Sequence, residues 1–169
     1  RQMCIRDRYY ATCNNISSLY VARKYLENAI ILDGDQIICN ERILISEFCR
    51  SGYNSVWTFE ETDEWLQTVK DGIVTACSRV GGGCGWQLYS ISRWTAEDGR
   101  KLKKHLELEF EQKHNTQIYW DDIVMFCHSQ EYQLGIFEMQ PDDVIEIDSL
   151  EELISIDNNY VKYREKGLA

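Results

Sequence analysis

Apolar residues recur with the period of an amphipathic helix in two segments of the chain. Residues 14–26 place Leu19 and Leu26 on one face. Residues 95–114 repeat an apolar side chain at every fourth position from Leu102. The first segment begins with Asn and Ser and the second with Thr, Glu and Asp, which are residues that cap helices. Shorter helices are predicted over residues 121–128 and after the capping sequence at residues 149–152.

Strands are predicted where apolar residues alternate with polar ones or run together over a few positions. The predicted strands are residues 29–32, 55–60, 65–70, 73–80, 86–92, 134–139 and 144–147. The first of them, AIIL, is continuously apolar, which is typical of a strand buried on both faces of a parallel sheet. Residues 81–85 (GGGCG) predict a turn rather than a phosphate-binding loop, because a strand and not a helix follows them. The alternation of helices and strands predicts an α/β fold.

The composition describes one acidic domain. The chain has 169 residues, and its 18 Lys and Arg against 28 Asp and Glu give a formal net charge of −10. This length fits a single domain. The negative charge argues against nucleic acid as a partner, because a duplex binder needs a positive surface. No apolar run is long enough to span a membrane, so we expect no membrane insertion.

The seven cysteines and three histidines show no pattern typical of a disulfide framework or a zinc site. The cysteines form no Cys-x-x-Cys pair, and the histidines are scattered along the sequence. We therefore expect reduced thiols in a cytoplasmic protein.

The strongest candidate for chemistry is Asp33-Gly34-Asp35, directly after the first predicted strand. Ligands bind at the carboxyl ends of strands in open α/β sheets. Two carboxylates there suit Mg²⁺, which completes its shell with water and phosphate oxygens. Both nucleotidyltransferases and nucleotide-sugar glycosyltransferases use this arrangement. The alternative is an ordinary Asp-Gly turn at the end of a strand.

A second candidate is Tyr119-Trp120-Asp121-Asp122, where two aromatic residues precede two carboxylates. Aromatic faces beside a carboxylate attract quaternary ammonium groups through cation–π interactions. Other aromatic residues near predicted loops include Trp57, Trp65, Trp86 and Trp94. The alternative is a buried aromatic pair with one aspartate capping the next helix, and ordinary core packing for most of these side chains.

Together, these segments resemble the LicC-type CTP:phosphocholine cytidylyltransferases, which belong to the sugar-phosphate nucleotidyltransferase superfamily. The matching stretches are NNISSLYVARKYL (14–26), AIILDGDQ (29–36), DEWL (63–66), GWQLYSISRWT (85–95), IYWDDI (118–123) and VIEIDSLEEL (144–153). They occur in the order and at the spacing of the family. The resemblance implies a Rossmann-like, GT-A-like α/β fold in which helices flank a mixed sheet.

The resemblance also implies roles for five residues. Asp35 and Asp121 match the two catalytic carboxylates that bind Mg²⁺ in the family. Trp65, Tyr119 and Glu146 match positions of the pocket that binds the choline head group. The implied reaction transfers CMP from CTP to phosphocholine, forms CDP-choline and releases pyrophosphate. The implied partners are CTP and phosphocholine, or a similar phosphorylated small molecule.

One part of the family pattern does not occur in these 169 residues. The family begins with a strand and a loop of the G-x-G-[ST]-R kind, followed by a Pro-Lys segment. We therefore expect a domain that lacks its first βα units. Residues 1–8 (RQMCIRDR) are then a non-native leader, residues 9–157 a partial nucleotidyltransferase domain and residues 158–169 a tail. Such a fragment is expected to have little or no activity.

Three alternatives stay open at this point. The same reaction could use another acceptor, such as an aminoalkylphosphonate or a sugar 1-phosphate. The Asp-Gly-Asp sequence could serve a DxD-type glycosyltransferase. The chain could also be a binding module without catalytic activity.

Overall fold

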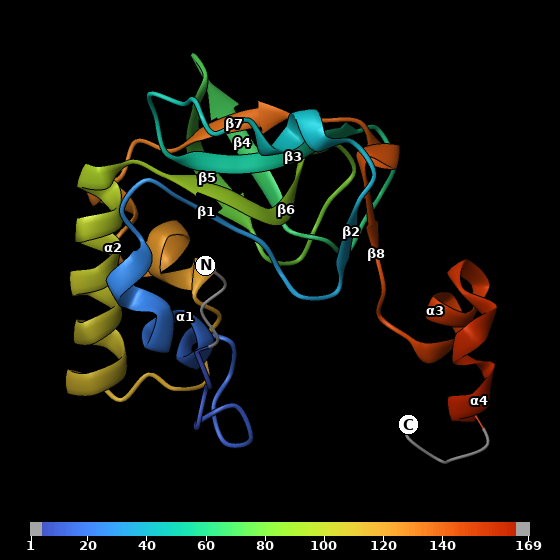
Figure 1. Ribbon diagram of the computed structural model, residues 1–169. Coiled ribbons are helices and arrows are strands. Elements are labelled where there is room, and N and C mark those ends of the chain that lie inside the picture. The colour runs from blue at the N-terminus through green and yellow to red at the C-terminus, as the bar shows by residue number, and fades with distance from the viewer. Residues whose placement is uncertain (1–4, 165–169) are drawn as a thin grey trace.

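A mixed six-stranded sheet forms the centre of the molecule, and α1 and α2 lie against one of its faces (Figure 1). The computed structural model describes residues 5–164. The strands of this sheet are β1 (Ala29–Ile31), β3 (Gly52–Thr58), β4 (Leu66–Lys70), β5 (Ile73–Ser78), β6 (Gly85–Trp94) and β7 (Gly135–Glu138). Their order is β5-β4-β6-β3-β7, and β1 also pairs with β6. A separate two-stranded sheet joins β2 (Gln36–Ile38) to β8 (Val144–Glu146).

Three of the helices in the described residues lie in segments that the sequence predicts to be helical, and the fourth lies in the predicted tail of residues 158–169. They are α1 (Ile16–Ala22), α2 (Ala96–Glu107), α3 (Leu150–Ile156) and α4 (Val161–Arg164). Short 3-10 turns cover Arg23–Tyr25, Glu41–Leu44, Ser129–Glu131, Pro141–Asp143 and Asn158–Tyr160, and π-helical turns cover Leu108–Gln112 and Ile123–Cys127. No helix in the described part of the chain is long and apolar enough to cross a membrane.

Two of the predicted caps are confirmed, and one is not. The Thr95 hydroxyl accepts a hydrogen bond from the Asp98 amide, and the Ser149 hydroxyl accepts one from the Glu152 amide. Each bond satisfies an amide that the first turn of a helix leaves free. Asn15 precedes α1 without capping it, because its side-chain oxygen accepts from the amide of Trp120 instead.

The prediction for residues 29–32 was wrong in its pairing. β1 runs antiparallel to β6, with Ala29 opposite Trp94, and it is half-buried rather than enclosed. The apolar run has another physical cause. Ile31 packs against the core on the helical side of the sheet, whereas Ile30 packs against the core on the other side. The parallel pair of the sheet is β3 with β7.

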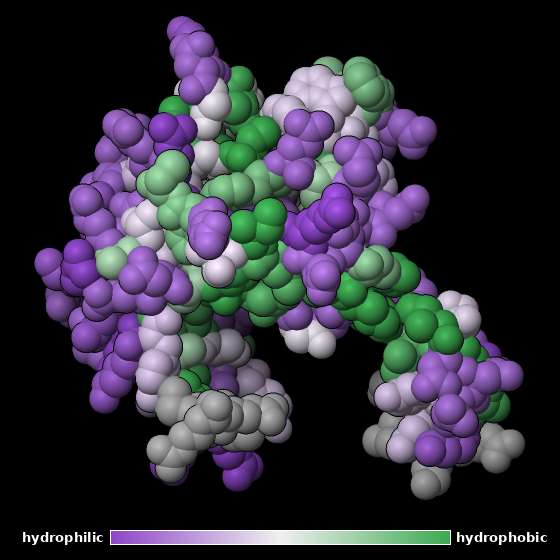
Figure 2. Space-filling view, turned by 45° about the horizontal axis from the view of Figure 1, so that its top comes forward, coloured by the Kyte–Doolittle hydropathy of each residue, from purple (hydrophilic) through white to green (hydrophobic). Residues whose placement is uncertain are grey.

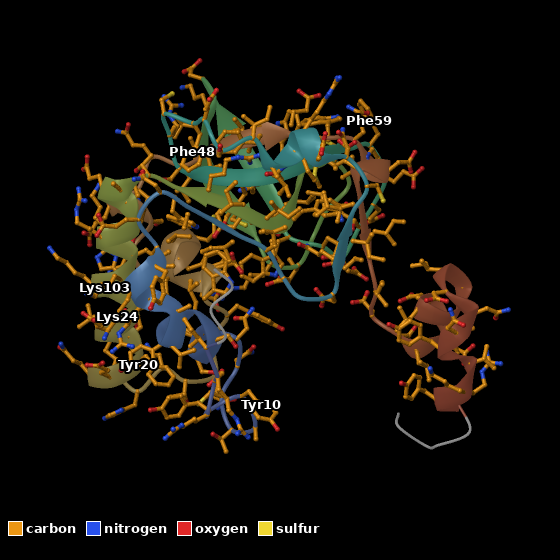
Figure 3. All side chains as sticks on the ribbon, viewed as in Figure 1. Tyr10, Tyr20, Lys24, Phe48, Phe59 and Lys103 are labelled. Atoms are coloured by element: carbon orange, nitrogen blue, oxygen red, sulfur yellow. The ribbon has the colours of Figure 1, made fainter. Side chains whose placement is uncertain are left out.

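The larger core lies between the sheet and the helices and is rich in aromatic side chains. Trp94 is fully buried and makes edge contacts with Tyr53, Trp120 and Tyr132 at ring-centroid distances of 6.2, 6.0 and 6.1 Å. Figure 3 shows Tyr20 on the helical side and the charged ends of Lys24 and Lys103 outside this layer. The aromatic core therefore fixes the position of residues 119–122 relative to the sheet.

A smaller core covers the opposite face of the sheet. It contains Ile43, Val56, Ile91, Met139 and Val144. Arg93 closes this side with a guanidinium 4.1 Å from the centroid of Phe137, and it donates hydrogen bonds to the Asn54 side chain and the Ile43 carbonyl. An arginine can be buried here because its donors find acceptors.

The helices α3 and α4 form an arm that stands apart from the sheet (Figures 1 and 2). β8 leads into the arm, and none of its helical residues is buried. Ion pairing between Arg164 and Glu151 joins α4 to α3.

We predict that Gly99→Ala destabilises the protein, although alanine is normally the better helix former. A Cβ atom at Gly99 would lie 2.2 Å from the carbonyl oxygen of Leu26, so α2 would have to move away from the chain before β1. The expected loss is about 1–3 kcal/mol of unfolding free energy, measured by urea denaturation.

Gly83→Ala is the matched control, because a Cβ atom there meets no other atom within 4 Å. A Gly99→Ala variant as stable as the Gly83→Ala variant would contradict the close contact between α2 and Leu26.

Candidate active site

A cavity of about 230 Å³ opens where β1 ends. Four of the five predicted site residues line it: Trp65, Tyr119, Asp121 and Glu146. The remaining lining residues are Asn15, Asp33, Glu64, Gln87, Leu88 and Ser90. The structure therefore brings together side chains from six separate parts of the sequence, with aromatic faces and carboxylates lining one cavity.

Asp121 lies at the base of the site and is held by the sheet. Only 5% of the residue is exposed, and the Tyr53 hydroxyl donates a hydrogen bond of 2.7 Å to its Oδ1. Trp120, the preceding residue, is buried and stacks on the Tyr53 ring at a centroid distance of 5.9 Å. Trp120 therefore belongs to the core, and its anchoring leaves Tyr119 half-exposed at the mouth and Asp121 inside.

Burial raises the pKa of Asp121 to about 7. The neighbouring charges of Asp33 and Asp122 also raise this pKa, while the hydrogen bond from Tyr53 opposes the shift. Burial raises the pKa of Asp33 as well, and the charge of Asp35 adds to that effect. Asp33 and Asp121 are both hard to ionise in this site, and a bound divalent cation would stabilise their ionised forms.

Asp33 and Asp35 occupy different places in the site. Asp33 lines the cavity, whereas Asp35 is exposed at its edge. The pairing of β2 with β8 sets Gln36 opposite Glu146, and the Asp35 carbonyl accepts a hydrogen bond from the Ile147 amide. Asp35 thus lies close enough to Glu146 for its charge to raise the pKa of that carboxyl.

The other wall of the cavity is aromatic and acidic. The Trp65 ring makes an edge contact with Tyr119 at 6.0 Å between centroids. Glu64 and Glu146 add carboxylates beside these rings. Burial raises the pKa of Glu146, and the charge of Glu64 contributes to the shift. This wall can receive an organic cation, which the rings and the carboxylates would both attract.

Arg79, which follows β5, holds the aromatic wall in place. Its Nε and Nη2 atoms donate to Asp122 Oδ1 at 2.8 and 2.5 Å, and Asp122 Oδ2 accepts from the Tyr119 amide at 2.9 Å. The guanidinium lies 3.8 Å from the Phe126 centroid and 5.8 Å from that of Trp65. Arg79 is thus a positioning residue for Trp65 and Tyr119, the two aromatic residues that the resemblance assigns to the pocket.

Sequence reasoning missed several of these residues. Asn15, Gln87, Leu88 and Ser90 line the cavity, and Tyr53, Arg79 and Asp122 hold its walls. The sequence gave some indication of Asp33 and Asp122, because they lie within two residues of the predicted ligands Asp35 and Asp121. It gave none of Arg79 and Tyr53, because their contacts join segments that are 43 and 68 residues apart in the chain.

The chain is similar to two curated cytidylyltransferases. It is 28% identical over 159 residues to the 2-aminoethylphosphonate cytidylyltransferase of Lancefieldella rimae, and 26% identical over 143 residues to the choline-phosphate cytidylyltransferase of Streptococcus pneumoniae. These matches cover 93% and 85% of this chain, and 64% and 62% of the relatives. The chain therefore spans less than two thirds of the length of either relative. No family model matches the chain.

Solved structures agree with the curated relatives. The CTP:phosphocholine cytidylyltransferase LicC of Streptococcus pneumoniae superposes with a TM-score of 0.78 and 25% identity, over 90% of this chain and 66% of that one. An inositol-1-phosphate CTP transferase from T. maritima superposes with a TM-score of 0.59 and 14% identity, over 93% of this chain and 64% of that one. These likenesses confirm the predicted Rossmann-like nucleotidyltransferase fold, with a mixed sheet flanked by helices.

We predict that Asp121→Asn changes how stability depends on pH. Because the folded-state pKa is raised from 3.8 to about 7, the folded protein keeps a proton that the unfolded chain loses between roughly pH 4 and pH 7. The contribution of Asp121 is therefore fully present below pH 4 and is lost as the pH rises through 7. The unfolding free energy of the wild type should fall by up to about 4 kcal/mol more than that of the variant over this range.

Urea denaturation at several pH values, in the presence of EDTA, measures this difference. Asp63→Asn is the control, since Asp63 is an exposed aspartate outside the cavity. Parallel pH profiles for the wild type and Asp121→Asn would contradict the perturbed carboxyl.

Proposed function

Because the chain has the fold of the LicC-type CTP:phosphocholine cytidylyltransferases, we propose that it forms the acceptor-binding side and the metal carboxylates of a Mg²⁺-dependent cytidylyltransferase. In the proposed reaction a phosphate oxygen of phosphocholine attacks the α-phosphorus of CTP. Pyrophosphate leaves, and CDP-choline forms. The observation that carries the proposal is the single cavity that combines Trp65, Tyr119, Glu146 and Asp121.

The aromatic wall suits a trimethylammonium group. This cation cannot donate hydrogen bonds, so it is recognised by ring faces and by charge at short range. Trp65 and Tyr119 supply the faces, and Glu64 and Glu146 supply the negative charge. Arg79 keeps Tyr119 in place through Asp122, and it covers the Phe126 ring, which makes an edge contact with Trp65.

The acidic end of the cavity suits Mg²⁺. Asp121 and Asp35 are the proposed ligands, and Asp33, two residues before Asp35, is a further carboxylate that lines the cavity. Mg²⁺ at this end would neutralise phosphate charge as the pyrophosphate leaves. Tyr53 keeps the Asp121 carboxylate oriented, because its hydroxyl occupies one lone pair and leaves the others for a cation.

A second candidate acceptor is 2-aminoethylphosphonate, which one relative is named for. The two glutamates on the aromatic wall favour it, because a primary ammonium needs hydrogen-bond acceptors as well as negative charge. A DxD-type glycosyltransferase would use Asp33 and Asp35, but it leaves the aromatic wall and Glu146 without a role. Transfer of CMP from CTP is therefore the proposed reaction for either acceptor, phosphocholine or 2-aminoethylphosphonate.

The proposal includes the behaviour of these 169 residues on their own. They contain no G-x-G-[ST]-R sequence to cradle a triphosphate. We expect them to bind the acceptor and to form little CDP-choline from CTP. A cytoplasmic location is part of the same proposal, because the cysteine spacing shows no disulfide pattern.

Titration calorimetry with phosphocholine, phosphoethanolamine and 2-aminoethylphosphonate tests the acceptor site. We expect phosphocholine to bind, and Trp65→Leu to weaken its binding about 30-fold, since a desolvated cation–π contact contributes about 2 kcal/mol. The affinity for the two primary amines should change much less.

Trp57→Leu is the matched control, because Trp57 lies outside the cavity and contacts Phe59 and Trp86. Phosphocholine binding that survives Trp65→Leu unchanged would sink the aromatic-pocket hypothesis. Tighter binding of 2-aminoethylphosphonate than of phosphocholine would select the second acceptor.

Binding of Mn²⁺ as a paramagnetic substitute for Mg²⁺ tests the carboxylates, with phosphocholine present. We expect Asp121→Asn and Asp35→Asn each to weaken binding by about tenfold or more, because each removes an anionic oxygen ligand. Asp63→Asn should have no effect. Weakening by Asp33→Asn in place of Asp35→Asn would assign the second ligand to the carboxylate that lines the cavity.

A further inference from the structure

A second group of ligand-type side chains lies at the other end of the segment that begins with Asp121. His105 comes from α2, His128 follows the π-helical turn Ile123–Cys127, and Glu131 ends the next 3-10 turn. His105 Nε2 lies 3.3 Å from one Glu131 oxygen, and His128 Nδ1 lies 3.4 Å from the other. One donor atom from each side chain falls within 4.8 Å of the other two.

The outward nitrogens of both imidazoles are already bonded to other groups. His128 Nε2 lies 2.8 Å from Glu109 Oε1, and His105 Nδ1 lies 2.7 Å from the Tyr132 hydroxyl. Because the Glu109 carboxylate can only accept a hydrogen bond, His128 carries its proton on Nε2 and presents the lone pair of Nδ1 toward Glu131. Metal-binding histidines are oriented in this way by a carboxylate or another oxygen on the second nitrogen.

The support behind His128 is itself fixed. Glu109 is only 1% exposed, and it accepts hydrogen bonds of 2.7 Å from Lys113 and 2.5 Å from Asn115. These partners hold the pKa of Glu109 below its usual value despite its burial. A buried carboxylate with this many partners is a rigid support for an imidazole rather than a surface ion pair.

We propose that His105, His128 and Glu131 bind one transition-metal ion of the Zn²⁺ type, with water completing the shell. Two imidazoles and one carboxylate are a donor set that Zn²⁺ takes in four-coordinate sites. Ligand atoms around a tetrahedral Zn²⁺ lie about 3.3 Å apart, given bonds of about 2.0–2.1 Å. Both nitrogen-to-carboxylate distances in the group already match this spacing.

Binding requires one small rearrangement. The two rings are stacked, with centroids 3.9 Å apart and planes 4° from parallel, so their lone pairs run side by side. An ion in the plane of both rings needs one imidazole to turn about its Cβ–Cγ bond, a torsion with broad preferences. Glu131 is the mobile partner, because 57% of its side chain is exposed, and it also gives ions access from solvent.

This site differs in chemistry from the cavity that Asp121 lines. Imidazole donors favour Zn²⁺, Co²⁺ or Ni²⁺, whereas a set of carboxylates favours Mg²⁺. The ion would tie α2 to the segment from Asp121 to Glu131, so its expected role is structural. The inference does not depend on the proposed reaction.

Titration of the full chain with Co²⁺, followed by absorption spectroscopy, tests the site. Six cysteines in the described part of the chain are free thiols, so competing ligands must be distinguished. We expect one Co²⁺ to bind without the near-ultraviolet charge-transfer band of a thiolate complex. His128→Gln and Glu131→Gln should each abolish this binding, and Tyr132→Phe should weaken it about 10- to 100-fold. Zn²⁺ should displace Co²⁺ and raise the Tm of the wild type, but not that of His128→Gln or Glu131→Gln.

His114→Asn is the matched control, because His114 is the histidine that does not belong to the proposed site. It is exposed and has a φ of 57°, which asparagine tolerates. It should bind Co²⁺ as the wild type does. Circular dichroism checks the fold of each variant. If His128→Gln does not fold, Glu131→Gln still tests the site, because it changes an exposed side chain. A thiolate band, or wild-type Co²⁺ affinity in Glu131→Gln, would overturn the proposal.

Discussion

The buried hydrogen bond between Tyr53 and Asp121 joins the sheet to the candidate active site. Tyr53 is fully buried in β3, and its ring stacks on Trp120 and meets the edge of Trp94. The hydroxyl thus comes from a fully buried side chain of the core and donates to the carboxylate of Asp121. Removing the Tyr53 hydroxyl would leave the buried Asp121 carboxylate without its donor. The loss of unfolding free energy would then exceed the net contribution of the hydrogen bond.

This constraint explains why the site concentrates negative charge. Asp121 cannot move toward solvent while Trp120 is packed in the core, so it stays in the cavity that Asp33 also lines. A chain with a net charge of −10 has few cations to spare, and Arg79 is committed to Asp122. Burial and neighbouring negative charge raise the pKa values of both carboxyls, so a bound proton or a bound cation would stabilise them.

The sequence predicts the elements well and their partners poorly. Caps and periodicity depend on neighbouring residues, so α2 with Thr95 and α3 with Ser149 were predicted where they occur. The pairing of β1 depends on β6, more than sixty residues away, and an apolar run cannot show which strand lies beside it. In the site, the resemblance to the family pointed to Trp65, Tyr119, Asp121 and Glu146, but a one-dimensional pattern could not show that Asp33 rather than Asp35 lines the cavity.

Glu146 shows how this cavity can distinguish between cations of the same charge. Burial and the nearby charge of Glu64 raise its pKa, so ionised Glu146 is unfavourable until a cation lies beside it. A primary ammonium brings three donors and must leave strongly bound water, while the faces of Trp65 and Tyr119 offer it no hydrogen-bond acceptor. A trimethylammonium has no donors to satisfy and gains contact with Trp65 and Tyr119 as well as charge. The proposed preference for the methylated head group therefore depends on an aromatic wall that would compensate the charge without requiring further hydrogen bonds.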